Sequence, residues 1–544
     1  MRSALARSAV PTAVMMSLTV MLAAGTANAS VSHSQIQGSG SSWSANAVNQ
    51  WIADVHQKGL DVVFTANGSA QGRQDFAYKT TDFAVSDIGY QGVDPGTGQD
   101  DTSLGRAFAY LPVVAGGTAF PYNLKIGNQQ VKNLRLSGKT LALIFTNHIT
   151  NWNDPEIRAD NNGRSFPALR IIPVVHSEGS GSTAQLTQYL NTDYQSIWKP
   201  FNNGLGSFTE YFPRAGTQIA QNGSDGVMNF ISSAAANGSI GYDEYSYALS
   251  AGFPVVNVEN SAGYFTAPDQ YNVAVALTQA IINSNPASPN YLLQDLHRVY
   301  VYADRRTYPL SSYSYMLVPT ASSDARMTTA KRQTLADYLY YAVCQGQAEM
   351  GPIGYSPLPI NLVQASFAQT AKLHTADPGV NLSSDNVANC HNPTFVAGQP
   401  TRNYLAEIAP QPPLCAKVGQ GPCSASQISN GNPTGGHAPS TGGTGGTSGT
   451  SGSSGSKTTS TARASAGASS SGTVNSITGQ TQTTAQSQAG ADAALAASPT
   501  VLSGDASSNM TGVLAGLAAI ELLLLLVLPP VLYRRFGRRS GVRS

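Results

Sequence analysis

The chain has few charged residues. Only 11% of its 544 positions are Asp, Glu, Lys or Arg, and the 31 basic residues nearly balance the 30 acidic ones. A chain without a marked excess of one charge lacks the electrostatic signature of a nucleic-acid-binding protein, and it does not favour an acidic partner either. We therefore expect neither class of partner.

Cysteine is also scarce. There are four cysteines, and the first is Cys344. No cysteine lies directly after the N-terminal apolar segment, which excludes a lipoprotein signal. No C-x-x-C spacing occurs, which argues against a metal site.

Motifs of common hydrolases are missing. The sequence contains no G-x-S-x-G elbow, no H-E-x-x-H helix and no S-x-x-K motif with its partners. Ser137–Thr140 (SGKT) mimics the end of a P-loop, but the required first glycine is Asn133, so we interpret the segment as a helix start. A secreted phosphatase would need a metal cluster or a nucleophile–base pair that we do not find. We expect no catalytic residues, no cofactor and no metal.

The N-terminus has the three parts of a secretory signal. Arg2 and Arg7 form a basic region, residues 10–24 are apolar, and Ala27-Asn28-Ala29 is a cleavage site. We predict that residues 1–29 are removed and that the remainder is exported.

The C-terminus predicts a membrane tether. Residues 424–508 consist mainly of Gly, Ser, Thr, Ala and Gln, a composition typical of a disordered linker. Residues 511–533 are apolar over about a bilayer thickness and precede a basic tail at 534–544. Because basic residues mark the cytoplasmic side, we predict a single-pass protein of the cell membrane with its body outside.

The cysteines predict disulfides. An even number in an oxidising compartment indicates two bonds. We favour Cys344 with Cys390 and Cys415 with Cys423, although three connectivities are possible.

One stretch, residues 174–190 (VVHSEGSGSTAQLTQYL), has the pattern of an anion site. An apolar strand leads into the loop Gly179–Thr183, and a helix follows. The unpaired N–H groups and the positive end of the helix dipole attract anions, and serine hydroxyls add donors. The alternative interpretation is an ordinary capped helix start.

Similar units recur along the chain. A strand, a turn of small residues and a helix follow one another at 60–78, and a short strand at 82–87 ends in a carboxylate. This alternation predicts an α/β fold with ligands at the carboxyl ends of strands.

Several stretches together resemble the secreted phosphate-binding proteins that deliver phosphate to high-affinity ABC importers. They cover about residues 35–375 and are Gly38–Trp43, Asn67–Ser69, Asp82–Asp87, Leu136–Ile157, VVHSEGSGST, Asp225–Ala248 and Gly354–Pro359. The resemblance implies a two-lobed periplasmic-binding-protein-like fold, with the anion in a cleft between the lobes. It implies lobe I at about 30–111 and 301–375, lobe II at about 112–300, and a cysteine-containing extension at 376–423, all within a solute-binding region at 30–423.

The resemblance also implies the ligands of the anion. Carried over position by position, they are Ser42, Trp43, Ser69, Asp87, Ser180, Gly181 and Ser182. Glu178 is expected to support these residues without contacting the anion itself. An acceptor such as Asp87 suits a ligand that carries a proton, which hydrogen phosphate does and sulfate does not. The implied partners are inorganic phosphate and an ABC permease, and the protein is expected to be a monomer.

One departure from the family concerns charge. The family's loop carries an arginine ahead of the acidic residue, whereas this loop is one residue shorter and has none. His176 could replace it at the site. Arg73 could also compensate, but we expect it to be a solvated helix residue. The alternative function is a binding module that has changed its ligand, or lost it and become a surface receptor.

Overall fold

The computed structural model describes residues 32–93 and 98–424. The expected signal at 1–29, the membrane segment at 511–533 and the basic tail lie outside these residues, as does all of the expected linker except Ser424. Within the described ranges, no helix has both the length and the apolar character needed to cross a bilayer.

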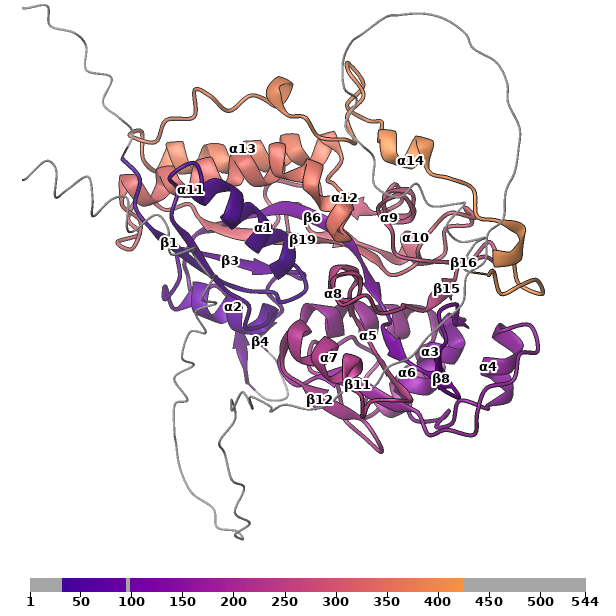
Figure 1. Cartoon of the computed structure of the whole chain (residues 1–544). Coiled ribbons are helices and arrows are strands. Elements are labelled where there is room, and N and C mark those ends of the chain that lie inside the picture. The colour runs from indigo at the N-terminus through magenta and orange to yellow at the C-terminus, as the bar shows by residue number, and fades with distance from the viewer. Residues whose placement is uncertain (1–31, 94–97, 425–544) are drawn as a thin grey trace, which may run out of the picture. The chain divides into compact units, whose positions relative to one another are not determined.

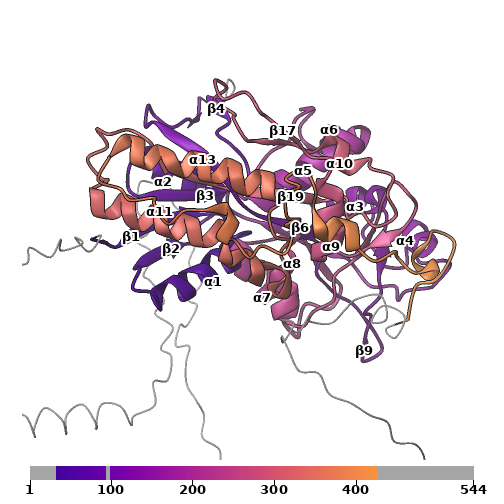
Figure 2. The ribbon, with the colours of Figure 1, turned by 90° about the horizontal axis from the view of Figure 1, so that it is seen from above.

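The first lobe, lobe I, is built on a six-stranded sheet. Its order is β14-β6-β19-β3-β1-β2, with β1 (Ile36–Gly40), β2 (Val62–Thr65), β3 (Phe83–Ser86), β6 (Phe108–Ala119), β14 (Asp243–Glu244) and β19 (Ser311–Pro319). The strands β2, β1 and β3 are parallel, whereas β19 is antiparallel to both β3 and β6. Helices α11 and α13 lie along one side of this sheet (Figures 1 and 2).

The second lobe, lobe II, contains two smaller sheets. The first has the order β12-β11-β13-β7 and the second β10-β15-β16. Their bounds are β7 (Tyr122–Asn123), β10 (Arg135–Leu136), β11 (Ile172–His176), β12 (Ile219–Gln221), β13 (Ser239–Gly241), β15 (Asn257–Glu259) and β16 (Phe265–Thr266). In Figure 1 this lobe occupies the lower right, with the magenta helices α5 to α8 around β11.

The remaining strands form three short ribbons. They pair β4 (Gly92–Val93) with β5 (Asp100–Asp101), β8 (Lys125–Ile126) with β9 (Gln129–Gln130), and β17 (Ile281–Ile282) with β18 (Gln294–Asp295).

The helices follow the predicted alternation. They are α1 (Ala45–His56), α2 (Ser69–Ala77), α3 (Gly138–Phe145), α4 (Pro155–Asp160), α5 (Gly181–Asp193), α6 (Gln195–Phe201), α7 (Gly223–Ser232), α8 (Tyr245–Ser250), α9 (Gln270–Leu277), α10 (His297–Tyr300), α11 (Thr329–Val343), α12 (Met350–Ile353), α13 (Ile360–Ala376) and α14 (Tyr404–Ile408). Short 3-10 turns occur at Gln345–Glu349, Val387–Asn389 and Leu414–Ala416. Ser137 caps α3 by accepting from the amide of Thr140, so the SGKT segment is a helix start, as predicted.

Long strands connect the lobes. Strand β6 carries the chain out of the lobe I sheet, and β7 of lobe II follows within a few residues. Strand β14 directly follows β13 of lobe II and pairs with the end of β6, before the chain continues to β15 of lobe II. All nine residues of β19 are buried, as expected of a central strand covered on both faces. One hydrophobic cluster runs through both lobes without a break.

The segment from 377 to 424 spans both lobes. The Cys344–Cys390 disulfide attaches it to the end of α11, and Arg135 of lobe II donates to the carbonyl of Cys415. A second disulfide joins Cys415 to Cys423. The favoured cysteine pairing is therefore confirmed.

Candidate functional site

Helix starts meet between the lobes. Helices α1 and α2 begin in lobe I, α5 and α7 begin in lobe II, and none of the four has a side-chain cap. Elsewhere Asp269 and Thr328 cap their helices in the usual way. An uncapped helix start leaves amide donors for other partners. Here Ala70 on α2 donates to the carbonyl of Gly179 in lobe II, and Ser224 on α7 donates to Ser42 of lobe I.

The amides of α5 have no such partner. Those of Gly181, Ser182 and Thr183 donate to no acceptor among the described residues. The hydroxyl of Ser182 is also buried and unpaired. The start of α5 therefore gathers four unused donors, which is the arrangement that the loop sequence predicts for an anion.

Asp87 is the acceptor of the site. It follows β3, is 1% exposed, and its Oδ2 accepts from the hydroxyls of Ser41 at 2.6 Å and Ser69 at 3.1 Å. Its other oxygen, Oδ1, is buried without a partner. Burial raises the pKa of Asp87, while the hydroxyls of Ser41, Ser314 and Ser69 oppose the rise.

The two lobes touch at Asp87. A Cβ atom added to Gly181 of lobe II would lie 1.7 Å from Oδ2 of Asp87, so only glycine fits there. Gln185, one turn further along α5, donates to the backbone carbonyl of Asp87 at 3.0 Å. The described structure is thus a closed arrangement, with the start of α5 pressed against the carboxylate.

Ser42 joins α7 to the site. Its hydroxyl oxygen accepts from the amide of Ser224 at 3.2 Å and from the Ser224 hydroxyl at 3.0 Å. Because the oxygen already accepts two bonds, the proton of Ser42 is available to another acceptor. Helix α7 is thereby a fourth helix start at the site, in addition to the three expected.

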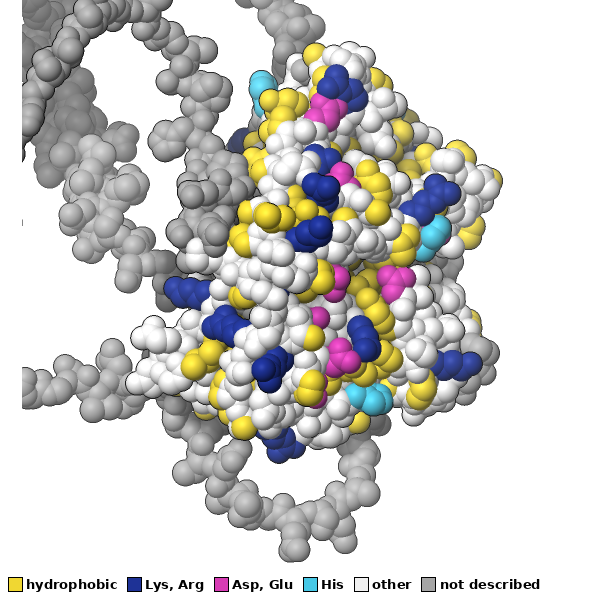
Figure 3. Space-filling view, turned by 90° about the vertical axis from the view of Figure 1, so that its right-hand side faces the viewer, with side chains coloured by type: hydrophobic (Ala, Val, Ile, Leu, Met, Phe, Trp, Pro, Cys, Tyr) yellow, Lys and Arg dark blue, Asp and Glu magenta, His cyan; other side chains and the backbone are white. Residues whose placement is uncertain are grey.

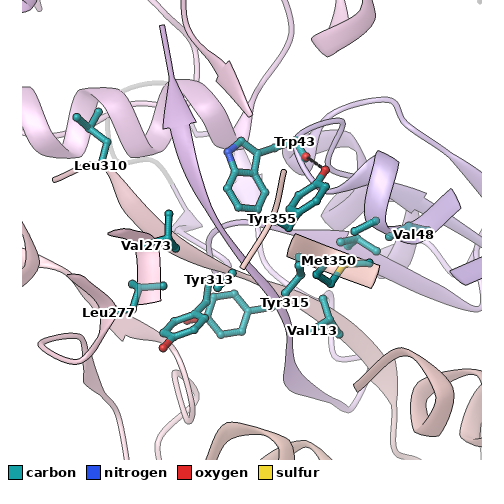
Figure 4. Close-up of a cluster of buried hydrophobic side chains, with 14 of the residues drawn as sticks. Trp43, Val48, Val113, Val273, Leu277, Leu310, Tyr313, Tyr315, Met350 and Tyr355 are labelled. Carbon is teal, nitrogen blue, oxygen red and sulfur yellow. Dashed lines mark hydrogen bonds between the residues drawn. The ribbon is translucent and has the colours of Figure 1, made fainter. Parts of the chain in front are cut away.

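The indole of Trp43 is packed in the core. Its indole is 1% exposed and packs edge-on against Tyr355, with ring centroids 5.7 Å apart (Figure 4). The Tyr355 hydroxyl donates to the carbonyl of Trp43 at 2.6 Å. The ring therefore belongs to the core near β6 and β19, and it fixes the position of the first helix start.

The buried His176 pairs with the partly buried Glu178. Nδ1 of His176 lies 2.7 Å from Oε1 of Glu178, and Nε2 lies 3.3 Å from the carbonyl of Tyr242. Oε2 of Glu178 accepts from the amide of Gly223, at the start of α7. Burial would lower the pKa of His176, but the hydrogen bond and charge of Glu178 raise it overall. Both ring nitrogens are engaged, so His176 holds Glu178 in place and presents no free donor to an anion.

The expectation that Arg73 is a solvated residue is wrong. We expected a solvated helix residue, but Arg73 is 0% exposed and lies at the centre of an ionic cluster. Its guanidinium donates to both oxygens of Asp101, to Oε1 of Glu210 at 2.6 Å and to the hydroxyl of Ser86. Burial would lower the pKa of Arg73, but the two carboxylates outweigh burial and raise the pKa above its ordinary value. The side chain therefore stays charged. A buried charge needs such partners, and they lie too far away in sequence to be seen locally.

The structure brings most of the expected residues together. Ser69 donates to Asp87 within lobe I, and Asp87 contacts Gly181 of lobe II. Ser180 and Ser182 flank Gly181 at the start of α5. Sequence reasoning missed Ser41, although it lies within the Gly38–Trp43 stretch, and Ser224, whose place at the start of α7 was its only signal. In the described part of the chain no His, Cys, Asp or Glu cluster is suited to a metal ion.

The closed pair of lobes, joined by long strands around a polar site, defines the class of protein. A family model described as PBP superfamily domain matches residues 25–345, more than half of the chain, so the chain belongs to this superfamily.

Charged side chains of both signs are scattered over the face in Figure 3, without a patch of one sign.

Individual relatives narrow the family. Phosphate-binding protein PstS 2 of Mycobacterium tuberculosis is 30% identical over 341 residues, which are 60% of this chain and 83% of that protein. PstS3 of Mycobacterium bovis is 31% identical over 335 residues, 60% of this chain and 82% of that protein. A solved high-affinity periplasmic phosphate-binding protein shares 20% identity with a TM-score of 0.47, covering 64% of this chain and 99% of that one. The chain belongs to the PstS family of phosphate-binding proteins.

Proposed function

We propose that this chain binds inorganic phosphate between its two lobes and has no catalytic activity. The observation that carries the proposal is that unused donors of lobe II and an unused acceptor of lobe I lie where the two lobes meet. The amides of Gly181, Ser182 and Thr183 and the hydroxyl of Ser182 lack acceptors, while Oδ1 of Asp87 lacks a donor. Buried polar atoms are almost always paired, so this concentration of unpaired atoms supports a ligand with both kinds of group.

The chemistry of the ligand follows from the same atoms. Amides and hydroxyls stabilise the oxygens of an anion, and the helix dipole of α5 adds to their effect. A carboxylate acceptor repels a fully deprotonated anion but accepts a hydrogen bond from one that carries a proton. Hydrogen phosphate satisfies both requirements, and sulfate fails the second. The names of the relatives support the same ligand.

The proposed ligands are those implied by the sequence, with two adjustments. Ser42, Ser69, Ser180, Gly181 and Ser182 surround the anion together with Asp87 and the backbone of Trp43. His176 contributes through Glu178, which holds the start of α7, and not by direct contact.

The setting proposed for the protein is outside the cell. The secretory signal at 1–29 supports export, and the apolar run at 511–533 with its basic tail supports a membrane tether. The linker at 424–508 would then separate a phosphate-binding body from the membrane. An ABC permease is the partner that family membership supports.

A thermal shift across oxyanions tests the proposal. The full chain should melt at a higher temperature in millimolar phosphate, with no comparable shift in sulfate or nitrate. An unchanged melting temperature in phosphate would refute the proposed ligand. A shift in sulfate equal to that in phosphate would refute the role of Asp87 as an acceptor.

A further inference from the structure

An ion pair connects the two lobes beside the proposed anion site. Arg73 lies on α2 of lobe I, and Glu210 lies in lobe II, on the segment between α6 and β12. Nη2 of Arg73 is 2.6 Å from Oε1 of Glu210, and both residues are at most 9% exposed. The two positions are separated by 137 residues in the sequence. The contact therefore exists only when the lobes are together.

The two ends of the pair are anchored unequally. Arg73 is fixed within lobe I, because Asp101 on β5 binds it through two nitrogens and Ser86 at the end of β3 accepts from Nη1. Glu210 has Arg73 as its partner, and its other oxygen, Oε2, is buried and unpaired. Separation of the lobes would leave Arg73 neutralised by Asp101 and would return Glu210 to water. Closure therefore changes the environment of Glu210 more than that of Arg73.

Glu210 also touches the anion loop. Its backbone carbonyl accepts from the amide of Ser180 at 2.9 Å, and Ser180 is the residue from which α5 begins. The position of Glu210 is thus coupled to the position of the unpaired amides of α5. A force that draws Glu210 toward Arg73 also draws the start of α5 toward Asp87.

We propose that the Arg73–Glu210 pair is a latch that stabilises the closed form of the lobes and sets the residence time of the ligand. Arg73 does not contact the anion; it positions the start of α5 through Glu210. The expected effect on phosphate dissociation rests on the proposed function, whereas the expected effect on the opening of the lobes does not.

The direct test changes Glu210 to Gln in the full chain. Glutamine keeps the size of the side chain and one acceptor but removes the charge, so the fold should persist, as circular dichroism and melting would show. The phosphate dissociation rate should rise about tenfold or more with little change in the association rate, because the closed population falls. Dissociation within about twofold of the parent would overturn the latch.

A second readout needs no ligand. Spin labels at two exposed positions, His56 of lobe I and Lys199 of lobe II, report the distance between the lobes. The Glu210→Gln variant should show a larger share of long distances than the parent chain in buffer alone. Identical distance distributions would overturn the latch even if phosphate did not bind. Absence of phosphate binding with a changed distribution would refute the ligand and retain the latch.

Two further variants complete the design. Arg73→Lys keeps the charge but loses the fork that binds Asp101 and Glu210 together, so its dissociation rate should fall between those of the parent and Glu210→Gln. Glu156→Gln removes an exposed ion pair with Lys139 inside lobe II and serves as the matched control. It should leave both the distance distribution and the dissociation rate unchanged. An equal effect of the control would contradict the latch.

Discussion

Gly181 of lobe II lies so close to Asp87 of lobe I that an added Cβ would stand 1.7 Å from the carboxylate oxygen Oδ2. The same contact joins the start of α5 to the end of β3, two elements that belong to different lobes. Closure of the lobes and the geometry of the proposed phosphate site therefore require that position 181 carries no side chain.

The Gly181→Ala variant should bind phosphate at least about a hundredfold more weakly, because the methyl group prevents the lobes from closing over the anion. The fold itself should persist, since alanine is a better helix former than glycine. Titration calorimetry gives the affinity and thermal melting gives the stability. Gly226→Ala on α7 is the control, because its added Cβ meets nothing nearer than 3.5 Å. Phosphate affinity unchanged by Gly181→Ala would exclude this contact from the site.

Ser182 allows a test in which binding and stability change differently. Its buried hydroxyl has no partner, so Ser182→Ala should leave the ligand-free protein equally stable or slightly more stable. Phosphate affinity should fall about tenfold, the value of one hydrogen bond to an anion. The neighbouring Thr183→Val should instead lower stability by about 1 kcal/mol, because Thr183 bonds the hydroxyl of Tyr242 at 2.8 Å. A loss of stability in Ser182→Ala without a loss of affinity would contradict the assignment.

Asp243 should make the stability depend on pH. Burial raises its pKa to about 6, although His176, Ser224 and the amide of Glu244 oppose the rise and Glu178 adds to it. Between the unfolded value of 3.8 and about 6 the folded protein holds more protons than the unfolded chain, so the free energy of unfolding falls as pH rises.

The measurement compares Asp243→Asn with the parent chain in urea at pH 4 and pH 7. The difference between the two pH values should shrink in the variant by up to about 3 kcal/mol, the equivalent of two pKa units. Asp225→Asn, an exposed position on α7, is the control. The prediction is wrong if Asp243→Asn and the parent lose the same free energy between the two pH values.

The two disulfides should differ in their contribution to stability. Cys344–Cys390 closes 46 residues and Cys415–Cys423 closes 8. In the chain-entropy description, paired replacement by alanine costs about 4 kcal/mol for the first and about 2.5 kcal/mol for the second. Urea unfolding of the two double variants checks the order. A larger loss for the short loop would show that local contacts outweigh loop entropy.

The sequence predicted the local units of the fold well. Strand, turn and helix at 60–78 and the start of α3 at Ser137 depend on periodicity and capping, which act over a few residues. The anion loop at 174–190 was visible for the same reason. The even cysteine count predicted two disulfides, and the favoured pairing was one of three possible connectivities.

The sequence could not predict contacts between distant residues. Arg73 was expected in solvent because its partner Glu210 lies 137 residues away and no local pattern links them. Ser224 meets Ser42 across 182 residues, so the fourth helix start was missed. His176 could be named as a candidate, but only the fold shows that Glu178 and Tyr242 occupy its two nitrogens.

The most direct test of the central claim is calorimetric titration of the full chain with phosphate, repeated with sulfate and with the Asp87→Asn variant. The account predicts saturable one-to-one binding of phosphate, no competition by sulfate, and a variant in which the preference for phosphate over sulfate is lost. No heat of binding at millimolar phosphate, or an Asp87→Asn variant that still rejects sulfate, would contradict it.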